Sequence, residues 1–149
     1  MLESGTAWML VADGRRARLL VEQHRGAQLD EPTDWAMQIS DEDLYDIQDR
    51  APRSHDRFGH GRHAVDRGRN LHEAEEEKFL KRVADRLGEA EKRNAFDHLV
   101  IAAPPRALGL LRSMLPQNAQ ARLCATTPKD LLDESAPKLR ERLQELLRQ

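Results

Sequence analysis

The sequence predicts an α/β protein with three layers, in which helices cover a mixed sheet that starts with an antiparallel hairpin and continues with βαβ units. Two observations predict this class. Two short strand-like runs near the N-terminus flank a turn dipeptide, which indicates a hairpin. Further along the chain, helical and strand-like segments alternate, as is typical of βαβ units. The length of 149 residues suits a single domain over residues 1–149.

The hairpin is predicted from the runs Ala7–Ala12 and Arg16–Glu22. The first run, AWMLVA, is almost wholly apolar and suits a strand that is covered on both faces. Asp13 and Gly14 follow it, a dipeptide that favours a tight turn with positive φ. A third, outer strand is predicted at Trp35–Ile39, where apolar and polar residues partly alternate.

A long mobile loop is predicted at about residues 40–69, because this segment shows no helical or strand period. Asp30–Asp49 holds eight carboxylates and no lysine or arginine. Asp49–Asn70 then holds six arginines, three histidines and three glycines, with almost no apolar side chain. A segment of this composition cannot bury itself, so we expect it to project from the domain.

A long helix is predicted to begin at Asn70 and to end near Arg93 and Asn94. Asparagine is a good N-cap, and Glu73 stands at capping-box spacing from it. Further glutamates crowd the next turn, where the helix dipole favours negative charge. The apolar stripe expected to face the sheet consists of Phe79, Leu80, Val83, Ala84, Leu87 and Ala90.

The run Phe96–Ala103, FDHLVIAA, is the most strand-like in the chain and is predicted to be central and parallel. Two prolines break it, and Pro105 can occupy the first turn of a helix. That helix is predicted at Ala107–Leu115.

The last strand is predicted at Ala121–Thr126. Thr127 and the proline after it are predicted to open a short helical turn that reaches Leu132. Ser135–Arg148 is predicted to be a final amphipathic helix. This order of elements fits RNase H-like and related three-layer folds.

The net charge, the cysteine content and the lack of a long apolar segment indicate where the protein is expected to function. The formal net charge is −2, so the whole-chain charge does not indicate a nucleic-acid binder. Cys124 is the single cysteine, which excludes an intrachain disulfide and fits a reducing compartment. It is predicted to be an inert thiol in a buried strand. No secretion signal and no membrane-spanning apolar segment is visible, so we expect a cytoplasmic protein that does not enter a membrane.

Enzymatic chemistry finds little support in the sequence. The histidines His55, His60, His63 and His72 lack the ligand spacing of familiar zinc sites, so no metal ion and no cofactor is expected. A two-metal nuclease needs carboxylates that converge on one face. Asp13 is better explained as a turn residue and Asp130 as a helix cap, and Asp97 precedes its strand. A hydrolase that acts through His60 and His63 stays open as a third hypothesis.

Several stretches, in their order along the chain, resemble one known family. They are Trp8–Leu20, Gly61–Asp66, the helix start at His72–Phe79, and Asp97–Arg112 followed by Lys129–Leu131. Together they resemble the bacterial host attachment family, which is also described as a bacterial branch of the archaeo-eukaryotic release-factor domain superfamily. The resemblance implies a domain similar to the middle domain of that release factor and of Pelota. In that domain, a Gly-Gly-Gln loop before a long helix enters the peptidyl-transferase centre of the ribosome.

Gly59-His60-Gly61-Arg62 occupies the corresponding place in this sequence, before the predicted long helix. No glutamine stands beside these glycines, and Gln48 is the nearest. The resemblance therefore implies ribosome association without hydrolysis of peptidyl-tRNA by the usual route.

The leading hypothesis is a non-enzymatic protein that binds the ribosome or another structured RNA through the arginine-rich segment. Arginine makes bidentate contacts to phosphate, and flexible arginine-rich segments order on RNA. The predicted contacts are Arg50, Arg53, Arg57, Gly59, His60, Gly61, Arg62, His63, Arg67 and Arg69. The alternative is a protein–protein interaction factor in bacterial attachment to host cells, whose acidic and basic segments bind a partner or form a homo-oligomer. Pairing of those two segments within one molecule also stays open.

Overall fold

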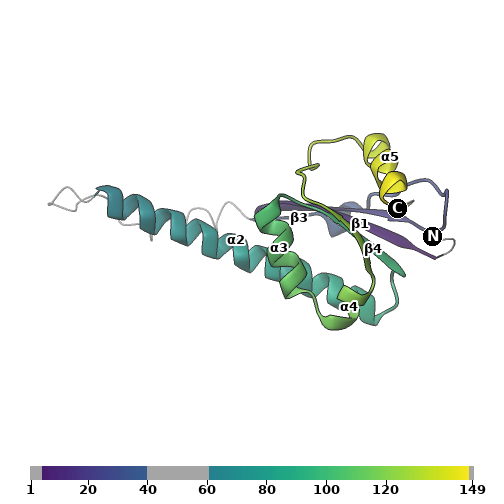
Figure 1. Ribbon diagram of the computed structural model, residues 1–149, viewed down its shortest axis with the longest axis horizontal. Coiled ribbons are helices and arrows are strands. Elements are labelled where there is room, and N and C mark those ends of the chain that lie inside the picture. Colours follow the sequence, from purple (N-terminus) through teal and green to yellow (C-terminus); the bar gives the residue numbers. More distant parts are fainter. Residues whose placement is uncertain (1–4, 40–60, 148–149) are drawn as a thin grey trace.

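Figure 1 shows the computed structural model, in which one sheet lies in the middle and helices cover both of its faces. The structure describes residues 5–39 and 61–147, with side chains described for residues 5–39 and 71–147. This three-layer α/β arrangement confirms the predicted fold class. The narrower RNase H-like resemblance stays a prediction.

Within the described residues, the strands form one open mixed sheet in the order β3-β2-β1-β4-β5. The antiparallel part consists of β1 (Ala7–Ala12), β2 (Arg16–Glu22) and the edge strand β3 (Met37–Gln38). The parallel part continues from β1 to β4 (His98–Ala102) and then to β5 (Leu123–Thr127). The predictions of an N-terminal hairpin, an outer third strand and an interior parallel strand are thus confirmed.

The helices lie on both faces of this sheet. The described helical elements are η1 (Thr33–Trp35), α2 (Gly61–Lys92), α3 (Pro105–Met114), α4 (Gln117–Ala121) and α5 (Ala136–Leu147). α2, α3 and α4 cover one face, and α5 covers the other (Figure 1). The short helix α4 was not predicted from the sequence, and no helix forms between Thr127 and Leu132.

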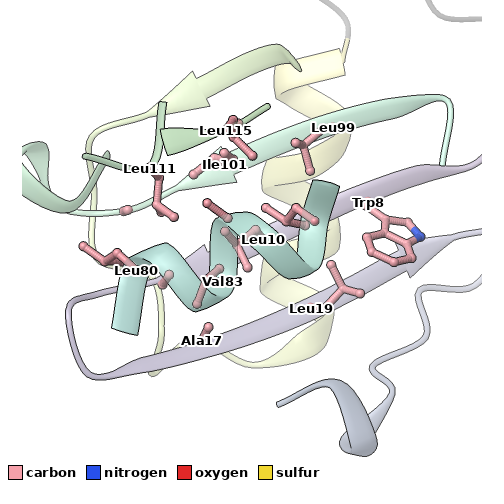
Figure 2. Close-up of a cluster of buried hydrophobic side chains, with 14 of the residues drawn as sticks. Trp8, Leu10, Ala17, Leu19, Leu80, Val83, Leu99, Ile101, Leu111 and Leu115 are labelled. Carbon is pink, nitrogen blue, oxygen red and sulfur yellow. The ribbon is translucent and has the colours of Figure 1, made fainter. Parts of the chain in front are cut away.

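Two hydrophobic clusters occupy the two faces of the sheet. The first joins alternate residues of β1 and β2, such as Leu10 and Leu19, to the apolar stripe of α2 and to α3 (Figure 2). The second joins the opposite faces of the same strands to Leu139 and Leu143 of α5. Strand residues therefore contribute to both clusters, which explains why β1 is apolar throughout. Leu146 of α5 also packs against the second cluster.

The hairpin turn differs from its prediction at Gly14. Asp13 Oδ1 accepts hydrogen bonds from the backbone N–H groups of Arg15 (2.7 Å) and Arg16 (2.8 Å), so the aspartate does fix the turn. Gly14 does not adopt a positive φ, however. A Cβ at Gly14 would lie 2.8 Å from the carboxyl carbon of Glu76, so the glycine allows close approach of α2 instead.

The helix predicted from Asn70 begins nine residues earlier, at Gly61. Asn70 is therefore inside α2 and is not its N-cap, and Glu73 lies well past the first turn. Once a helix is nucleated, each added residue gains a backbone hydrogen bond without a new nucleation cost, so a polar segment can continue it. The part of the predicted loop from residue 61 onward is helical, and residues 40–60 lie outside the described residues.

The C-terminal end of α2 confirms its prediction. Asn94 has a φ of 57°, in the left-handed region that ends many helices. The N–H of Ala95 donates to the carbonyl of Ala90 (3.0 Å), and the N–H of Asn94 donates to the carbonyl of Glu91 (2.9 Å). These two bonds form a Schellman motif, which directs the chain from α2 into β4.

Candidate interaction site

An open groove of about 510 Å³ lies between α2, the hairpin strands and η1. Its apolar lining comes from Trp8 of β1, Leu19 and Val21 of β2, and Pro32 and Trp35 at η1. The strand residues belong to the face of the sheet that α2 covers. The groove thus opens at the border of the first hydrophobic cluster, and its volume falls in the range of about 300–1,000 Å³ common for ligand sites.

The two tryptophans of the chain meet in this groove. The rings of Trp8 and Trp35 are nearly perpendicular, at 82°, with centroids 6.3 Å apart. Trp8 also packs on Phe96, with ring centroids 4.9 Å apart. Edge-to-face packing of this kind fixes the rings relative to each other and contributes about 0.5–1.5 kcal/mol beyond area burial. The aromatic wall of the groove is therefore preformed.

Both indole nitrogens keep a small exposed surface. Trp8 is 8% exposed and Trp35 is 6% exposed. Neither indole donates a hydrogen bond to another described residue, yet no fully buried polar side-chain atom among the described residues lacks a partner. The small exposed area of each ring must therefore include its nitrogen. Figure 2 shows the nitrogen of Trp8 turned away from the aliphatic side chains of the cluster.

Arg86 of α2 fastens η1 beside the groove. Its Nη1 donates to the carbonyl of Trp35 (3.0 Å), and its Nη2 donates to the carbonyl of Asp34 (3.1 Å). Its guanidinium carbon also lies 4.7 Å from the centroid of the Trp35 ring, in cation–π contact. Arg86 thus holds η1 against α2, and its positive charge remains at the groove because backbone carbonyls are neutral. The other arginine of the groove, Arg93, is exposed.

The rim of the groove carries three carboxylates, from Asp34, Asp85 and Glu89. Asp85 pairs with Lys81 (2.9 Å) and Glu89 pairs with Lys92 (3.3 Å), both on the surface of α2. Exposed pairs of this kind contribute only about 0–1 kcal/mol and exchange partners readily. The rim therefore carries exposed groups of both charges beside the aromatic residues of the groove.

The residues predicted to bind nucleic acid fall into two groups of five. The following five lie outside the described residues: Arg50, Arg53, Arg57, Gly59 and His60. The other five belong to the backbone of α2: Gly61, Arg62, His63, Arg67 and Arg69. This end of α2 extends beyond the sheet (Figure 1). The helix therefore places the second group of five away from the three-layer body.

The carboxylates considered for a nuclease have structural roles where the structure describes them. Asp97 Oδ2 accepts the backbone N–H of Thr6 (2.8 Å), and Asp130 Oδ1 accepts that of Leu132 (3.1 Å). Asp13 fixes the hairpin turn, as described above. Over residues 5–39 and 71–147, no group of three or more histidine, cysteine, aspartate or glutamate side chains could hold a metal ion.

The prediction that Cys124 is buried is wrong, because β5 is an edge strand and Cys124 is exposed. The register of β5 against β4 shifts at this residue. Its Sγ still donates a hydrogen bond to the carbonyl of Leu99 (3.4 Å), and partial burial of the sulfur raises the pKa of the thiol. A raised pKa leaves less thiolate, so the low reactivity expected of this thiol has a physical basis.

A family model described as "protein required for attachment to host cells" matches residues 8–143. The chain belongs to this family. The match to the host attachment family spans both tryptophans and the groove residues of α2. No curated protein shows significant similarity to the chain. No helix in the described part of this family member is long and apolar enough to cross a membrane.

Sequence reasoning missed the groove because its residues are far apart in the chain. Trp35 and Arg86 are separated by 51 positions, and no local pattern connects them. One signal was present: the chain has only two tryptophans, and both lie at predicted strands of the N-terminal region. In this protein, the antiparallel pairing of β1 and β2 and the covering helix α2 bring these distant residues together.

Proposed function

We propose that this member of the host attachment family is a non-enzymatic interaction factor that promotes the attachment of bacteria to host cells by binding a protein partner in the tryptophan groove. The match of the family model over most of the chain is the observation that carries the proposal. The groove supplies the contact surface. Tryptophan and arginine are enriched at protein interfaces, where an apolar centre is surrounded by a polar rim.

The test compares attachment by a strain that lacks the gene with attachment by strains complemented with variants. The double charge reversal Asp85→Lys and Glu89→Lys alters the exposed rim without touching the hydrophobic cluster. We expect complementation by the wild-type protein to restore the number of bacteria bound to host cells, and complementation by the rim variant to leave it near the level of the deletion strain.

A matched control exchanges another exposed ion pair, Lys138 and Glu141 on α5. The double substitution Lys138→Glu and Glu141→Lys should restore attachment fully, because α5 lies on the opposite face of the sheet. If the deletion leaves attachment unchanged, the proposed function is wrong. If the rim variant complements as well as the control does, the groove is not the contact surface.

Binding of the ribosome or another structured RNA is the second candidate function. The observation that favours it is the position of Arg62, Arg67 and Arg69 on the part of α2 that extends beyond the sheet (Figure 1). Neutralisation of phosphates by arginine releases counterions, so binding should weaken steeply as salt rises. Co-sedimentation with ribosomes at low and moderate salt tests this candidate. The double variant Arg67→Glu and Arg69→Glu should sediment less than the wild type, and equal sedimentation would exclude these arginines.

A further inference from the structure

We propose that residues 130–147 form a C-terminal cover that opens cooperatively from one face of the sheet while the rest of the fold stays intact, and that Arg18 holds this cover closed. The cover consists of α5 and the short segment that precedes it. Its opening exposes apolar side chains of the sheet, among them Met9, Leu20 and Val100. The inference does not depend on the proposed role in attachment.

The C-terminal cover closes a hydrophobic cluster of its own. Among the described side chains, no residue of α2, α3 or α4 belongs to the second cluster, and no residue of the cover belongs to the first. Figure 1 shows the same separation, with α5 on the face opposite α2 and α3. The buried residues that the cover contributes are Leu131, Leu132, Leu139 and Leu143. Loss of the cover therefore removes one apolar layer and leaves the contacts of the other layer in place.

The layer that the cover forms is the smaller of the two. α5 has 12 residues, of which Leu139 and Leu143 are buried. On the other face, α2 buries a stripe of side chains from Phe79 to Ala90, and α3 and α4 bury more beside it. Elements with few buried contacts open at a lower free energy than the core of the same protein. The cover is therefore the layer that opens first.

Contacts inside the cover join its parts into one unit. Both carboxyl oxygens of Glu134 accept hydrogen bonds from Arg142 (2.7 and 2.8 Å), which ties the segment before α5 to the helix. The carbonyl of Ser135 accepts the N–H of Leu139 (3.0 Å) at the start of α5. The exposed Pro128 lies between β5 and the cover. The segment and the helix thus separate from the sheet together, about an exposed link.

Arg18 of β2 makes the main polar contact between the sheet and the cover. Its Nη1 donates to the carbonyls of both Leu132 and Glu134. Its Nε and Nη2 bind the two carboxyl oxygens of Glu31, which fixes the orientation of the guanidinium. The side chain of Arg18 is only 22% exposed, so these hydrogen bonds are partly shielded from water. Two carbonyls of the cover lose their donor when it opens.

The other polar contacts between the cover and the rest of the chain are more exposed. Arg16 lies 3.4 Å from Asp133, and these side chains are 52% and 90% exposed. Arg140 donates to the carbonyl of Gly26 (2.9 Å) at the surface. Exposed contacts of this kind contribute little to stability. Arg18 is therefore the side chain whose replacement should loosen the cover most.

Native-state hydrogen exchange of the intact ¹⁵N-labelled protein, at several urea concentrations below the unfolding transition, tests the inference. A detached helix of 12 residues is too short to persist in water, so the amides of α5 exchange when the cover opens. We expect protection factors at least about tenfold lower in α5 than in β4. The α5 amides should share one opening free energy, with a weaker urea dependence than β4, because opening exposes less surface than global unfolding.

The variant Arg18→Lys tests how the cover is held. Lysine keeps the charge but lacks the fork of donors that reaches two carbonyls and Glu31 at once. We expect the α5 amides to exchange about tenfold faster in this variant. The matched control is Arg112→Lys, which changes an exposed arginine of α3 on the other face. The control should leave the exchange of α5 unchanged.

The variant Val83→Ala separates opening of the cover from global unfolding. Val83 of α2 is fully buried in the first cluster, which stays intact when the cover opens. The substitution should therefore speed exchange in β4 by about tenfold or more and leave the α5 amides unchanged.

The inference is overturned if the amides of α5 and β4 have the same protection and the same urea dependence, or if Val83→Ala speeds exchange equally in both. Protection that falls gradually towards Leu147 without any urea dependence would also overturn it, because that pattern indicates fraying of a helix end. If Arg18→Lys leaves the exchange of α5 at the wild-type rate, Arg18 does not hold the cover closed.

Discussion

Gly88 shows how a single residue sets the distance between two helices. It lies in α2, where a Cβ would be 2.6 Å from Cγ of Pro116, the residue that precedes α4. A proline ring cannot rotate away from such a contact. Gly109 in α3 provides a contrast, since a Cβ there would meet no atom within 4 Å. The same residue type thus has a packing role at one position and none at the other.

Gly88→Ala should destabilise the protein by about 1–3 kcal/mol, because overpacking against Pro116 outweighs the gain in helix propensity. Gly109→Ala should instead stabilise it by about 0.5–1 kcal/mol, because the exposed helix gains propensity without a clash. Urea unfolding measures both changes in free energy. If the two substitutions have effects of the same sign, the contact with Pro116 does not constrain α2.

At the scale of the element, α2 combines a packed part with a part that extends beyond the sheet. Among the described side chains, its buried residues begin at Phe79 and end at Ala90. A helix of 32 residues is about 48 Å long, longer than the packed stretch needs. Packing and the Schellman motif at Asn94 therefore fix the C-terminal end of α2, and the N-terminal end extends beyond the sheet.

Replacement of Asn94 tests this fixed end. Asn94→Ala should lower the free energy of unfolding by about 1 kcal/mol, because an alanine side chain clashes in the left-handed conformation. Asn94→Gly should leave stability unchanged or slightly raised, because glycine adopts this conformation without strain. Urea unfolding of the three proteins gives the comparison. Equal stabilities of the alanine and glycine variants would contradict the assigned role of the residue.

At the scale of the whole molecule, hydrogen bonds and ion pairs of two arginines connect the α5 layer to the sheet. Arg18 of β2 donates to the carbonyls of Leu132 (2.6 Å) and Glu134 (2.9 Å), just before α5. Its other nitrogens bind both carboxyl oxygens of Glu31. Arg142 of α5 makes a similar bidentate contact with the carboxylate of Glu134. These contacts connect β2, the segment before α5 and α5 itself.

These pairs predict that acid weakens the protein. Hydrogen bonds from Arg18 hold the pKa of Glu31 below its ordinary value of 4.5, and those from Arg142 do the same for Glu134. A carboxylate with a depressed folded-state pKa stabilises the protein above its unfolded pKa, and this contribution is lost as pH falls through the folded pKa. The stability difference between the wild type and Glu31→Gln with Glu134→Gln should therefore shrink between about pH 6 and pH 3.

Far-UV circular dichroism during urea unfolding at several pH values measures this difference. The control is the Lys81→Glu and Asp85→Lys protein, which exchanges an exposed ion pair on α2, keeps the pairs of Glu31 and Glu134, and should follow the wild-type pH dependence. A difference that stays constant down to about pH 3 would contradict the assigned coupling.

Local signals predicted much of the fold. The bounds of β1 and β2 agree with the apolar runs on either side of the turn, and the end of α2 agrees with Asn94. The predicted start of α2 was wrong because the capping pattern at Asn70 lies inside a helix that begins at Gly61. The groove could not be predicted, because it depends on contacts between residues of β1, η1 and α2. Such contacts follow from tertiary packing and leave no periodic trace in the sequence.

The pairing of Trp8 with Trp35 has a practical consequence for spectroscopy. Intrinsic tryptophan fluorescence of this protein reports only on the border between the hairpin, η1 and α2. The layer that contains α5 has no tryptophan, so its detachment would leave the emission spectrum nearly unchanged. If the fluorescence and circular dichroism transitions fail to coincide, an intermediate is populated. In that intermediate α5 has detached from one face of the sheet, while α2 still packs on the other.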